Sequence, residues 1–231
     1  MSAGLRRVAG EAWAFREQVE RDASRRFARL ALEIGGCDPG SPVPALLERA
    51  AGDERRHAAL CAGLRAAYGA PPGDDPLERR LAPSRLPQRE AALYEIVAAC
   101  CITETESVAT VATLLAAEAE PEVRAALHEI ARDEVVHSRI GWRHLAREAS
   151  AIDVSFLAEW IPAMLSGTIE PGLFSPPEAP EPEGLTRAGL LPRARKREVF
   201  VRTLEVVVLP GLEVFGVGTG PARDWLAQQQ R

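Results

Sequence analysis

The sequence lacks the features of several common protein classes. No apolar run approaches the roughly 20 residues that a helix needs to cross a bilayer, so we expect no membrane-spanning segment. Met1–Ala14 has no apolar run behind its Arg6–Arg7 pair, so we expect no secretory signal. The four cysteines show no C-x-x-C spacing, which argues against a zinc ribbon or a rubredoxin-type iron site. We expect reduced, mostly buried thiols in a cytoplasmic protein at Cys37, Cys61, Cys100 and Cys101.

A strong charge imbalance is also missing. The chain has 33 acidic and 28 basic residues, which gives a formal net charge of −5. This balance provides no general attraction to nucleic acid or to anionic lipid. The most basic run, Arg193–Arg197, is short, has no interleaved aromatic residue and is followed by Glu198. We interpret it as the solvated start of a helix, and we expect neither a membrane nor nucleic acid among the partners.

A strand pattern is hard to find, because Val and Ile rarely alternate with polar residues. Ala, Leu, Arg and Glu dominate the sequence, and all four favour helices. Helix-period patterns with clear start and stop signals predict four long helices, over Glu11–Ile34, Ala45–Tyr68, Gln88–Ala119 and Pro121–Ser150. The predicted fold class is therefore all-α, a four-helix bundle.

The sequence changes character after Ser150. We predict a shorter helix over Ile152–Ser166, interrupted by Pro162, and an exposed linker rich in Pro and Glu over Glu170–Gly184. One more helical stretch follows over Leu190–Val217, which Pro210 kinks or ends. Residues 11–150 are thus expected to form the bundle, and residues 151–231 a C-terminal helical extension packed on it.

The second and fourth predicted helices carry the same motif, D-E-x-x-H. It occurs at Asp53–His57 and again at Asp133–His137. Residues three apart share one face of a helix, so each Glu–His pair can point at one spot in a bundle interior. Carboxylate plus imidazole suits iron or manganese, whereas a set of thiolates would indicate zinc or an iron–sulfur cluster. The repeat therefore predicts metal ligands at Glu54, His57, Glu134 and His137.

A di-metal bundle also needs one Glu from each of the other two helices. On the first helix Trp13, Phe27 and Ile34 define an apolar stripe at sevenfold spacing, and Glu20 lies on it. Glu17 lies at the edge of this stripe. On the third helix Glu104 falls within an apolar stripe and Glu106 faces the opposite side. A buried carboxylate needs a compensating cation, so Glu20 and Glu104 complete the predicted set of six ligands.

This order of ligands resembles the ferritin-like di-iron carboxylate superfamily: one Glu, then E-x-x-H, then one Glu, then E-x-x-H. The resemblance covers about two-thirds of the chain, residues 11–150. The D-E-R-R-H segment at Asp53–His57 is also similar to the D-E-x-R-H signature of bacterial multicomponent monooxygenases and ribonucleotide reductase-like proteins. The resemblance implies a ferritin-like bundle with two iron ions, or one manganese and one iron. It further implies that Glu54 and Glu134 bridge the metals and that Glu20 and Glu104 are terminal ligands.

Two aspartates precede the motif glutamates. Asp53 and Asp133 can each accept a hydrogen bond from the histidine of the opposite helix, which would fix the ring and raise its basicity as a ligand. The alternative for each is a surface ion pair with one of the many arginines. His128 and His144 do not fit a neighbouring turn on the metal-facing side, and we expect polar roles outside the site for both.

An oxygen-activating oxidoreductase, an oxidase or monooxygenase, is the function that these features favour. Its partners would be dioxygen, a small organic substrate and an external electron donor, and we expect a monomer or homodimer. The residues after Ser150 support this reading, because they can cover the site or shape a substrate pocket. Three alternatives stay open. The first is iron handling, as a ferroxidase, an iron store or a peroxide-removing protein. The second is a metal-dependent structural bundle without turnover, and the third is action on a modified tRNA base.

Overall fold

The computed structural model describes residues 1–73, 80–169, 172–176 and 180–230. All regular secondary structure within these ranges is helical, which confirms the predicted all-α class. Four stretches make up the long helices: α1 (Ala3–Cys37), α2 (Val43–Ala67), the run α3–η1–α4 (Gln88–Ile96, Val97–Glu104, Thr105–Leu115) and α5 (Pro121–Ala149). Shorter elements follow: η2 (Ser155–Glu159), α6 (Ile161–Thr168), η3 (Thr186–Ala188), α7 (Arg193–Thr203), η4 (Leu204–Val208), α8 (Leu209–Val214) and α9 (Gly220–Gln229).

The chain divides into two compact units that interleave along the sequence. The first unit comprises Met1–Arg80, Val111–Asp133 and Ala179–Pro192, and the second comprises Leu81–Thr110, Glu134–Glu178 and Arg193–Arg231. Both units draw on residues 11–150 and on residues 151–231. One boundary between them falls inside α5, between Asp133 and Glu134, and another inside α4, between Thr110 and Val111, so each of these helices carries residues of both units.

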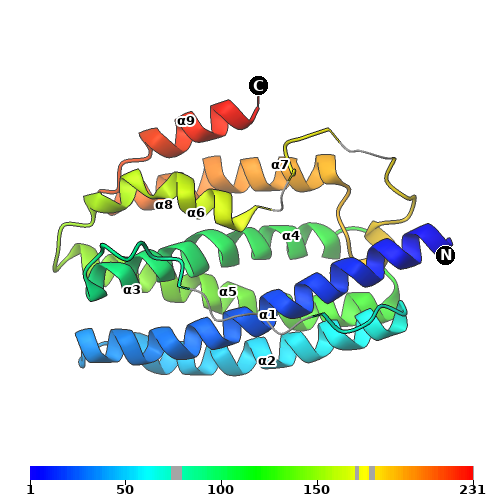
Figure 1. Cartoon of the computed structure of the whole chain (residues 1–231), viewed down its shortest axis with the longest axis horizontal. Helices are drawn as coiled ribbons and strands as arrows, with labels where there is room; N and C mark the ends of the chain where they lie inside the picture. Colours follow the sequence, from blue (N-terminus) through cyan, green and yellow to red (C-terminus); the bar gives the residue numbers. More distant parts are fainter. Residues whose placement is uncertain (74–79, 170–171, 177–179, 231) are drawn as a thin grey trace. The chain divides into compact units, whose positions relative to one another are not determined.

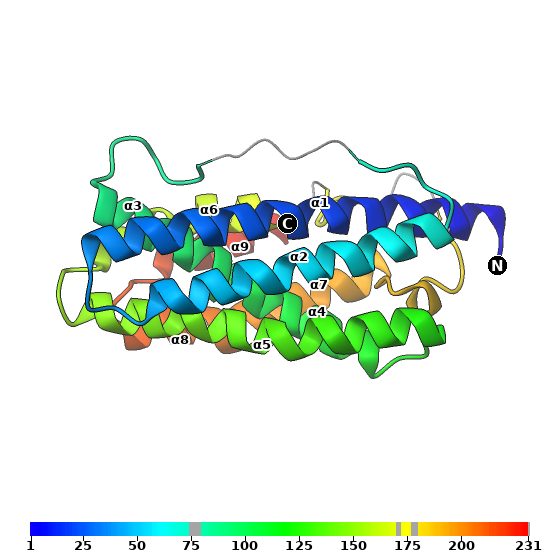
Figure 2. The ribbon, with the colours of Figure 1, turned by 90° about the horizontal axis from the view of Figure 1, so that it is seen from below.

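In the first unit, α1 and α2 pack side by side along their length (Figures 1 and 2). Helix α1 begins two turns earlier than predicted, because the Ser2 hydroxyl caps it by accepting the Leu5 N–H at 3.1 Å. The chain then turns through Asp38, whose N–H donates to the Ile34 carbonyl at 2.8 Å. The apolar side chains of α1 and α2 form one core with those of α4, α5 and η3, including Trp13, Leu64, Leu114, Leu127 and Ala188.

In the second unit, the third predicted helix is not uniformly α-helical. Its central segment η1 is a π-helix, in which the backbone makes wider turns. The Thr103 hydroxyl donates to the Ala98 carbonyl at 3.0 Å, and the Thr105 hydroxyl to the Cys100 carbonyl at 3.5 Å. Both bonds reach five residues back, as the π spacing does. Uniform apolar periodicity could not predict this local change.

The C-terminal elements agree with the sequence prediction only in part. η2 ends at Glu159 and α6 begins at Ile161, with Pro162 in its first turn, so the predicted interruption of this helix is found. Pro210 lies in the first turn of α8, which continues η4 without a break, so the helix does not end there and the kink stays a prediction. Helix α9 was not predicted. Part of the predicted linker, 170–171 and 177–179, lies outside the described residues, and Pro180, Glu181 and Glu183 are exposed as expected. Within the second unit, α9 packs on α6 (Figure 1).

The stretch Gln88–Leu115 is long and apolar enough to cross a membrane by length and composition, with a mean hydropathy of 1.3 in its most apolar window. The sequence analysis did not expect such a stretch. Its window is 56% buried inside the protein, and core helices meet the same criterion. The feature alone therefore does not distinguish a membrane helix from a core helix.

Gly189 follows η3 and lies against the apolar core of the first unit. Replacing this glycine tests how tightly that core is packed. Its φ is +79°, and an added Cβ would lie 2.6 Å from the Trp13 ring and 2.7 Å from Val123. We expect Gly189→Ala to lower the free energy of unfolding by about 2–3 kcal/mol through backbone strain and overpacking. Urea unfolding followed by circular dichroism measures the change. Gly63→Ala in α2, whose added Cβ meets nothing within 4 Å, is the matched control and should not destabilise the protein.

Candidate metal centre

The first unit brings together three of the six predicted ligands. Glu20 comes from α1, and Glu54 and His57 come from one face of α2. All three are buried, with exposed fractions of 7%, 0% and 1%. The His57 Nδ1 atom lies 3.1 Å from Glu54 Oε2 and 3.9 Å from Glu20 Oε2. We call these residues the first trio; its donor atoms all lie within 4.8 Å of one another.

Asp133 is a hydrogen-bond partner of the imidazole of this trio. His57 Nε2 lies 3.2 Å from Asp133 Oδ2, and Asp133 also accepts from Arg56 at 2.8 Å and from Arg132 at 3.1 Å. Burial alone would raise the pKa of Asp133, but the hydrogen bonds from Arg132 and His57 outweigh it and lower the pKa below its usual value. The anionic Asp133 can accept a hydrogen bond from Nε2, while Nδ1 faces the two glutamates.

Asp53 has different contacts from Asp133. It accepts a hydrogen bond at 2.6 Å from Arg56, whose side chain is 52% exposed. This contact is the surface ion pair that the sequence analysis kept as the alternative. A role for Asp53 in orienting a histidine stays a prediction.

The second unit brings together the other three predicted ligands. Glu104 comes from the last position of η1, and Glu134 and His137 come from one face of α5. Their exposed fractions are 6%, 2% and 0%, and His137 Nδ1 lies 3.6 Å from Glu134 Oε2. The donor atoms of this second trio also lie within 4.8 Å of one another. Glu106 is outside the trio, because it is half-buried and accepts a hydrogen bond from Thr110 at 2.8 Å.

Each trio fits a divalent cation. Two carboxylates and one imidazole converge in a buried place, where concentrated negative charge is costly unless a cation compensates it. Oxygen and nitrogen donors of this kind suit iron and manganese, and the donor set contains no thiolate. The structure therefore contains a carboxylate and histidine cluster able to hold metal.

Glu17 is a buried carboxylate of a different kind. It is only 1% exposed, although the sequence places it at the edge of the apolar stripe. Arg65 of α2 donates to it at 2.7 Å, and Arg21 of α1 forms a second ion pair. Two arginines thus provide the compensating charge, which makes Glu17 part of the α1–α2 packing. The sequence signal was the pair Glu17 and Arg21, four residues apart on one helix face.

A second polar layer lies further along α5 in the second unit. His144 and Glu148 are 3% and 1% exposed, and Arg89 of α3 donates to Glu148 at 2.7 Å. Glu95 is equally buried and accepts the backbone N–H groups of Leu81 and Ala82. The sequence analysis missed this layer. The sevenfold spacing from His137 to His144 was the available signal.

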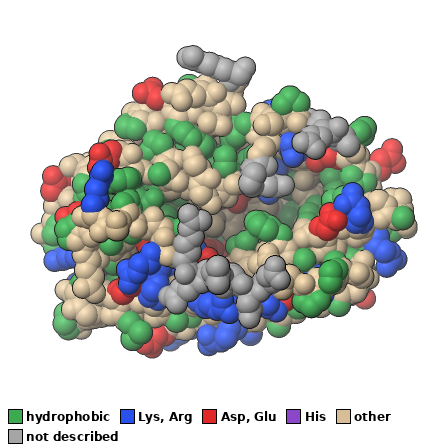
Figure 3. Space-filling model, in the orientation of Figure 1, with side chains coloured by type: hydrophobic (Ala, Val, Ile, Leu, Met, Phe, Trp, Pro, Cys, Tyr) green, Lys and Arg blue, Asp and Glu red, His purple; other side chains and the backbone are tan. Residues whose placement is uncertain are grey.

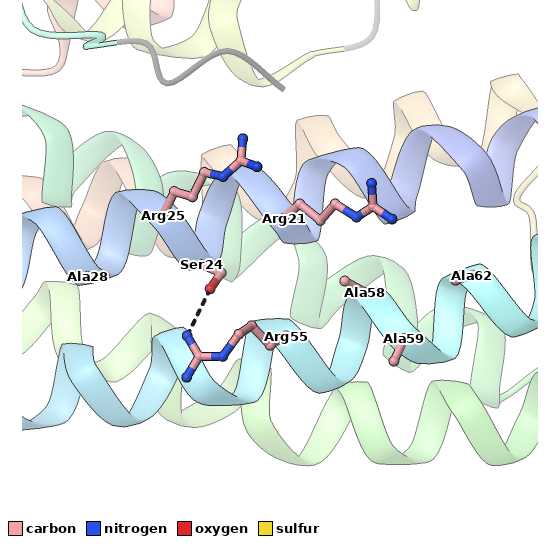
Figure 4. A pocket seen from close by; sticks show the side chains of 8 residues that line it. All are labelled: Arg21, Ser24, Arg25, Ala28, Arg55, Ala58, Ala59 and Ala62. Atoms are coloured by element: carbon pink, nitrogen blue, oxygen red, sulfur yellow. Dashed lines mark hydrogen bonds between the residues drawn. The ribbon is translucent and has the colours of Figure 1, made fainter. Parts of the chain in front are cut away.

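A solvent-open pocket of about 520 Å³ lies between α1 and α2 (Figure 4). Arg55 reaches from α2 to the Ser24 hydroxyl of α1 at 3.4 Å, and Arg21 and Arg25 lie along α1. Alanines form the rest of the lining: Ala28, Ala58, Ala59 and Ala62. None of the six predicted ligands lines this pocket. On the face in Figure 3, Lys, Arg, Asp and Glu side chains are interspersed among apolar ones, in agreement with the balanced net charge.

The chain matches no family model. It matches no curated protein. Among solved structures it is similar to protein 19 with aldehyde deformylating oxidase activity from Synechococcus, with a TM-score of 0.65 and 22% sequence identity. The alignment covers 98% of each chain. At this identity the likeness shows the fold, which confirms an all-α bundle of the ferritin-like type with additional C-terminal helices.

Two isosteric variants in metal-free protein separate Glu17 from the first trio. We expect Glu17→Gln to lower the free energy of unfolding by about 2 kcal/mol, because two arginines lose their buried anionic partner. Glu20→Gln should leave it unchanged or raise it, because it removes a negative charge whose donor atom lies within 4.8 Å of another carboxylate. Urea unfolding measures both. Equal losses in the two variants would contradict the distinction between Glu17 and Glu20.

Proposed function

We propose that the two trios form one dinuclear centre and that the protein is a di-iron, O2-dependent oxidase acting on a small organic substrate. The observation that carries the proposal is the matched pair of buried Glu plus E-x-x-H trios, one in each unit. In this proposal the ions would be held by the carboxylates of Glu20, Glu54, Glu104 and Glu134 and by the imidazoles of His57 and His137. Two irons are the proposed occupants, with one manganese and one iron as the variant.

The continuity of α5 supports a single centre. Asp133 hydrogen-bonds His57 of the first trio, and the next residue in the same helix, Glu134, belongs to the second trio. Adjacent residues of one helix thus serve both trios. In the second copy of the D-E-x-x-H motif, Asp133 contacts a histidine and the next residue, Glu134, is a proposed ligand.

Two ferrous ions, when bound, would supply electrons for the reduction of dioxygen. The residues of the chain hold, orient and isolate them. Carboxylates neutralise the ionic charge, and Asp133 can accept a hydrogen bond from His57 Nε2 so that Nδ1 can bind metal. Because the six ligands are at most 7% exposed, bulk water is kept from the reacting centre.

The C-terminal elements support an apolar substrate. Within the second unit, α6 and η4 pack against η1, the segment that ends at Glu104. Their buried side chains are aliphatic and include Ile161, Leu165, Leu204 and Val208. We propose an aldehyde with a hydrocarbon chain as the substrate class. The similarity to a protein with aldehyde deformylating oxidase activity over 98% of both chains supports this choice.

Anaerobic titration with Fe(II) tests the centre. We expect wild-type protein to take up about two irons per chain and to change its absorbance when O2 is added. Glu54→Ala and His137→Ala should abolish metal binding while largely keeping the helix content, because each removes a ligand. Glu106→Ala is the control and should bind iron like the wild type. Retention of both irons by the two ligand variants would refute the assignment.

Turnover of an aldehyde tests the proposed reaction. Iron-loaded protein supplied with O2, a chemical reductant and a medium-chain aldehyde should split the aldehyde into a one-carbon product, from its formyl carbon, and a remaining chain that is one carbon shorter. Gas chromatography and a one-carbon assay follow the two products, with His137→Ala as the inactive control. Iron oxidation by O2 without loss of aldehyde would contradict the proposed reaction and indicate iron handling.

A further inference from the structure

Gly141 lies in the interior of α5, where a glycine is less favourable than an alanine. It is buried and lies four residues after His137. An added Cβ would lie 2.6 Å from Cys100 Cβ, 2.9 Å from the Cys101 backbone nitrogen and 2.9 Å from Cys101 Sγ. Only a glycine allows α5 to approach η1 so closely, since real Cβ atoms essentially never come within 3.0 Å of another heavy atom.

The atoms that face Gly141 cannot rotate away. Cys100 Cβ and the Cys101 nitrogen are fixed to the η1 backbone, so a methyl group at position 141 would have to displace that backbone. Burial raises the pKa of the Cys101 thiol well above its usual value, and the sulfur therefore packs as a neutral group. The contact is purely steric, and the segment it restrains is the π-helix.

This contact lies one turn from the ligands on both elements. Cys100 precedes Glu104 by four residues on η1, and Gly141 follows His137 by four residues on α5. Thr103 and Thr105 flank Glu104, and their hydroxyls donate to carbonyls five residues back, so the wide π turn around the glutamate is held from within η1. Thr103 also hydrogen-bonds Thr168 of α6 at 3.2 Å. Because η1 is held internally in this way, its distance from α5 depends on the contact that Gly141 makes with Cys100 and Cys101.

We propose that Gly141 is a positioning residue that sets the distance between Glu104 and the pair Glu134 and His137 by letting α5 contact Cys100 and Cys101. The inference rests on the proposed function in that it assigns metal to this trio. The contact at Gly141 affects the position of Glu104, which lies in η1. Glu134 and His137 lie in α5 together with Gly141, so their positions relative to it are fixed by the helix.

Cobalt(II) titration followed by visible absorption tests the proposal, since it reports binding and ligand geometry without turnover. In Gly141→Ala we expect the affinity for one of the two cobalt ions to fall by about tenfold or more and the absorption spectrum to change. Losses of this size follow changes in groups that orient metal ligands. Gly167→Ala in α6 is the matched control from the same unit, because its added Cβ meets nothing within 4 Å. It should bind both ions like the wild type.

A compensating variant separates positioning from general damage. Gly141→Ala combined with Cys100→Gly removes the shortest of the three contacts, and part of the lost affinity should return. If Gly141→Ala does not reach the wild-type helix content, Cys101→Leu crowds the same contact from the η1 side and should weaken the same equivalent. Wild-type affinity and spectrum in folded Gly141→Ala or Cys101→Leu would overturn the role of Gly141. Wild-type protein that binds fewer than two ions would refute the proposed function instead.

Discussion

The burial of negative charge is the constraint on which the rest of this structure depends. Glu17, Glu20, Glu54, Glu104, Glu134 and Glu148 are all at most 7% exposed, and each carboxylate removed from water needs a positive or hydrogen-bonding partner. Arginines provide it for Glu17 and Glu148. In the two trios, carboxylates gather around an imidazole instead, which concentrates negative charge where a cation can offset it. The different partners separate glutamates that hold helices together from glutamates suited to bind metal.

A different local interaction positions the side chains of each trio. In the first unit, Asp133 lies within hydrogen-bond distance of His57, and its hydrogen bonds with Arg132 and His57 lower its pKa and favour its anionic form. In the second unit, the π turn of η1 and the close approach at Gly141 place Glu104 next to α5. Because α5 passes from one unit into the other, displacement of this helix would affect both trios.

The E-x-x-H spacing predicted four of the candidate ligands, and apolar stripes predicted the other two, because helix periodicity determines which residues share a buried face. Periodicity also predicted the long helices to within a few residues at most ends. It placed Glu20 on the apolar stripe and Glu17 at its edge, but it did not predict that Glu17 is buried too, because that burial depends on the partner Arg65 of α2. The π geometry of η1, the short α9 and the contact at Gly141 depend on packing between distant segments, which a local pattern does not contain.

The central claim is that the two trios form one dinuclear centre, and X-ray absorption of iron-loaded protein tests it most directly. If one centre holds both ions, the extended fine structure should contain an iron–iron distance of about 3–4 Å, as in two-metal sites generally. Iron bound at full stoichiometry without metal–metal scattering in that range would contradict the claim, and it would indicate two separate mononuclear sites.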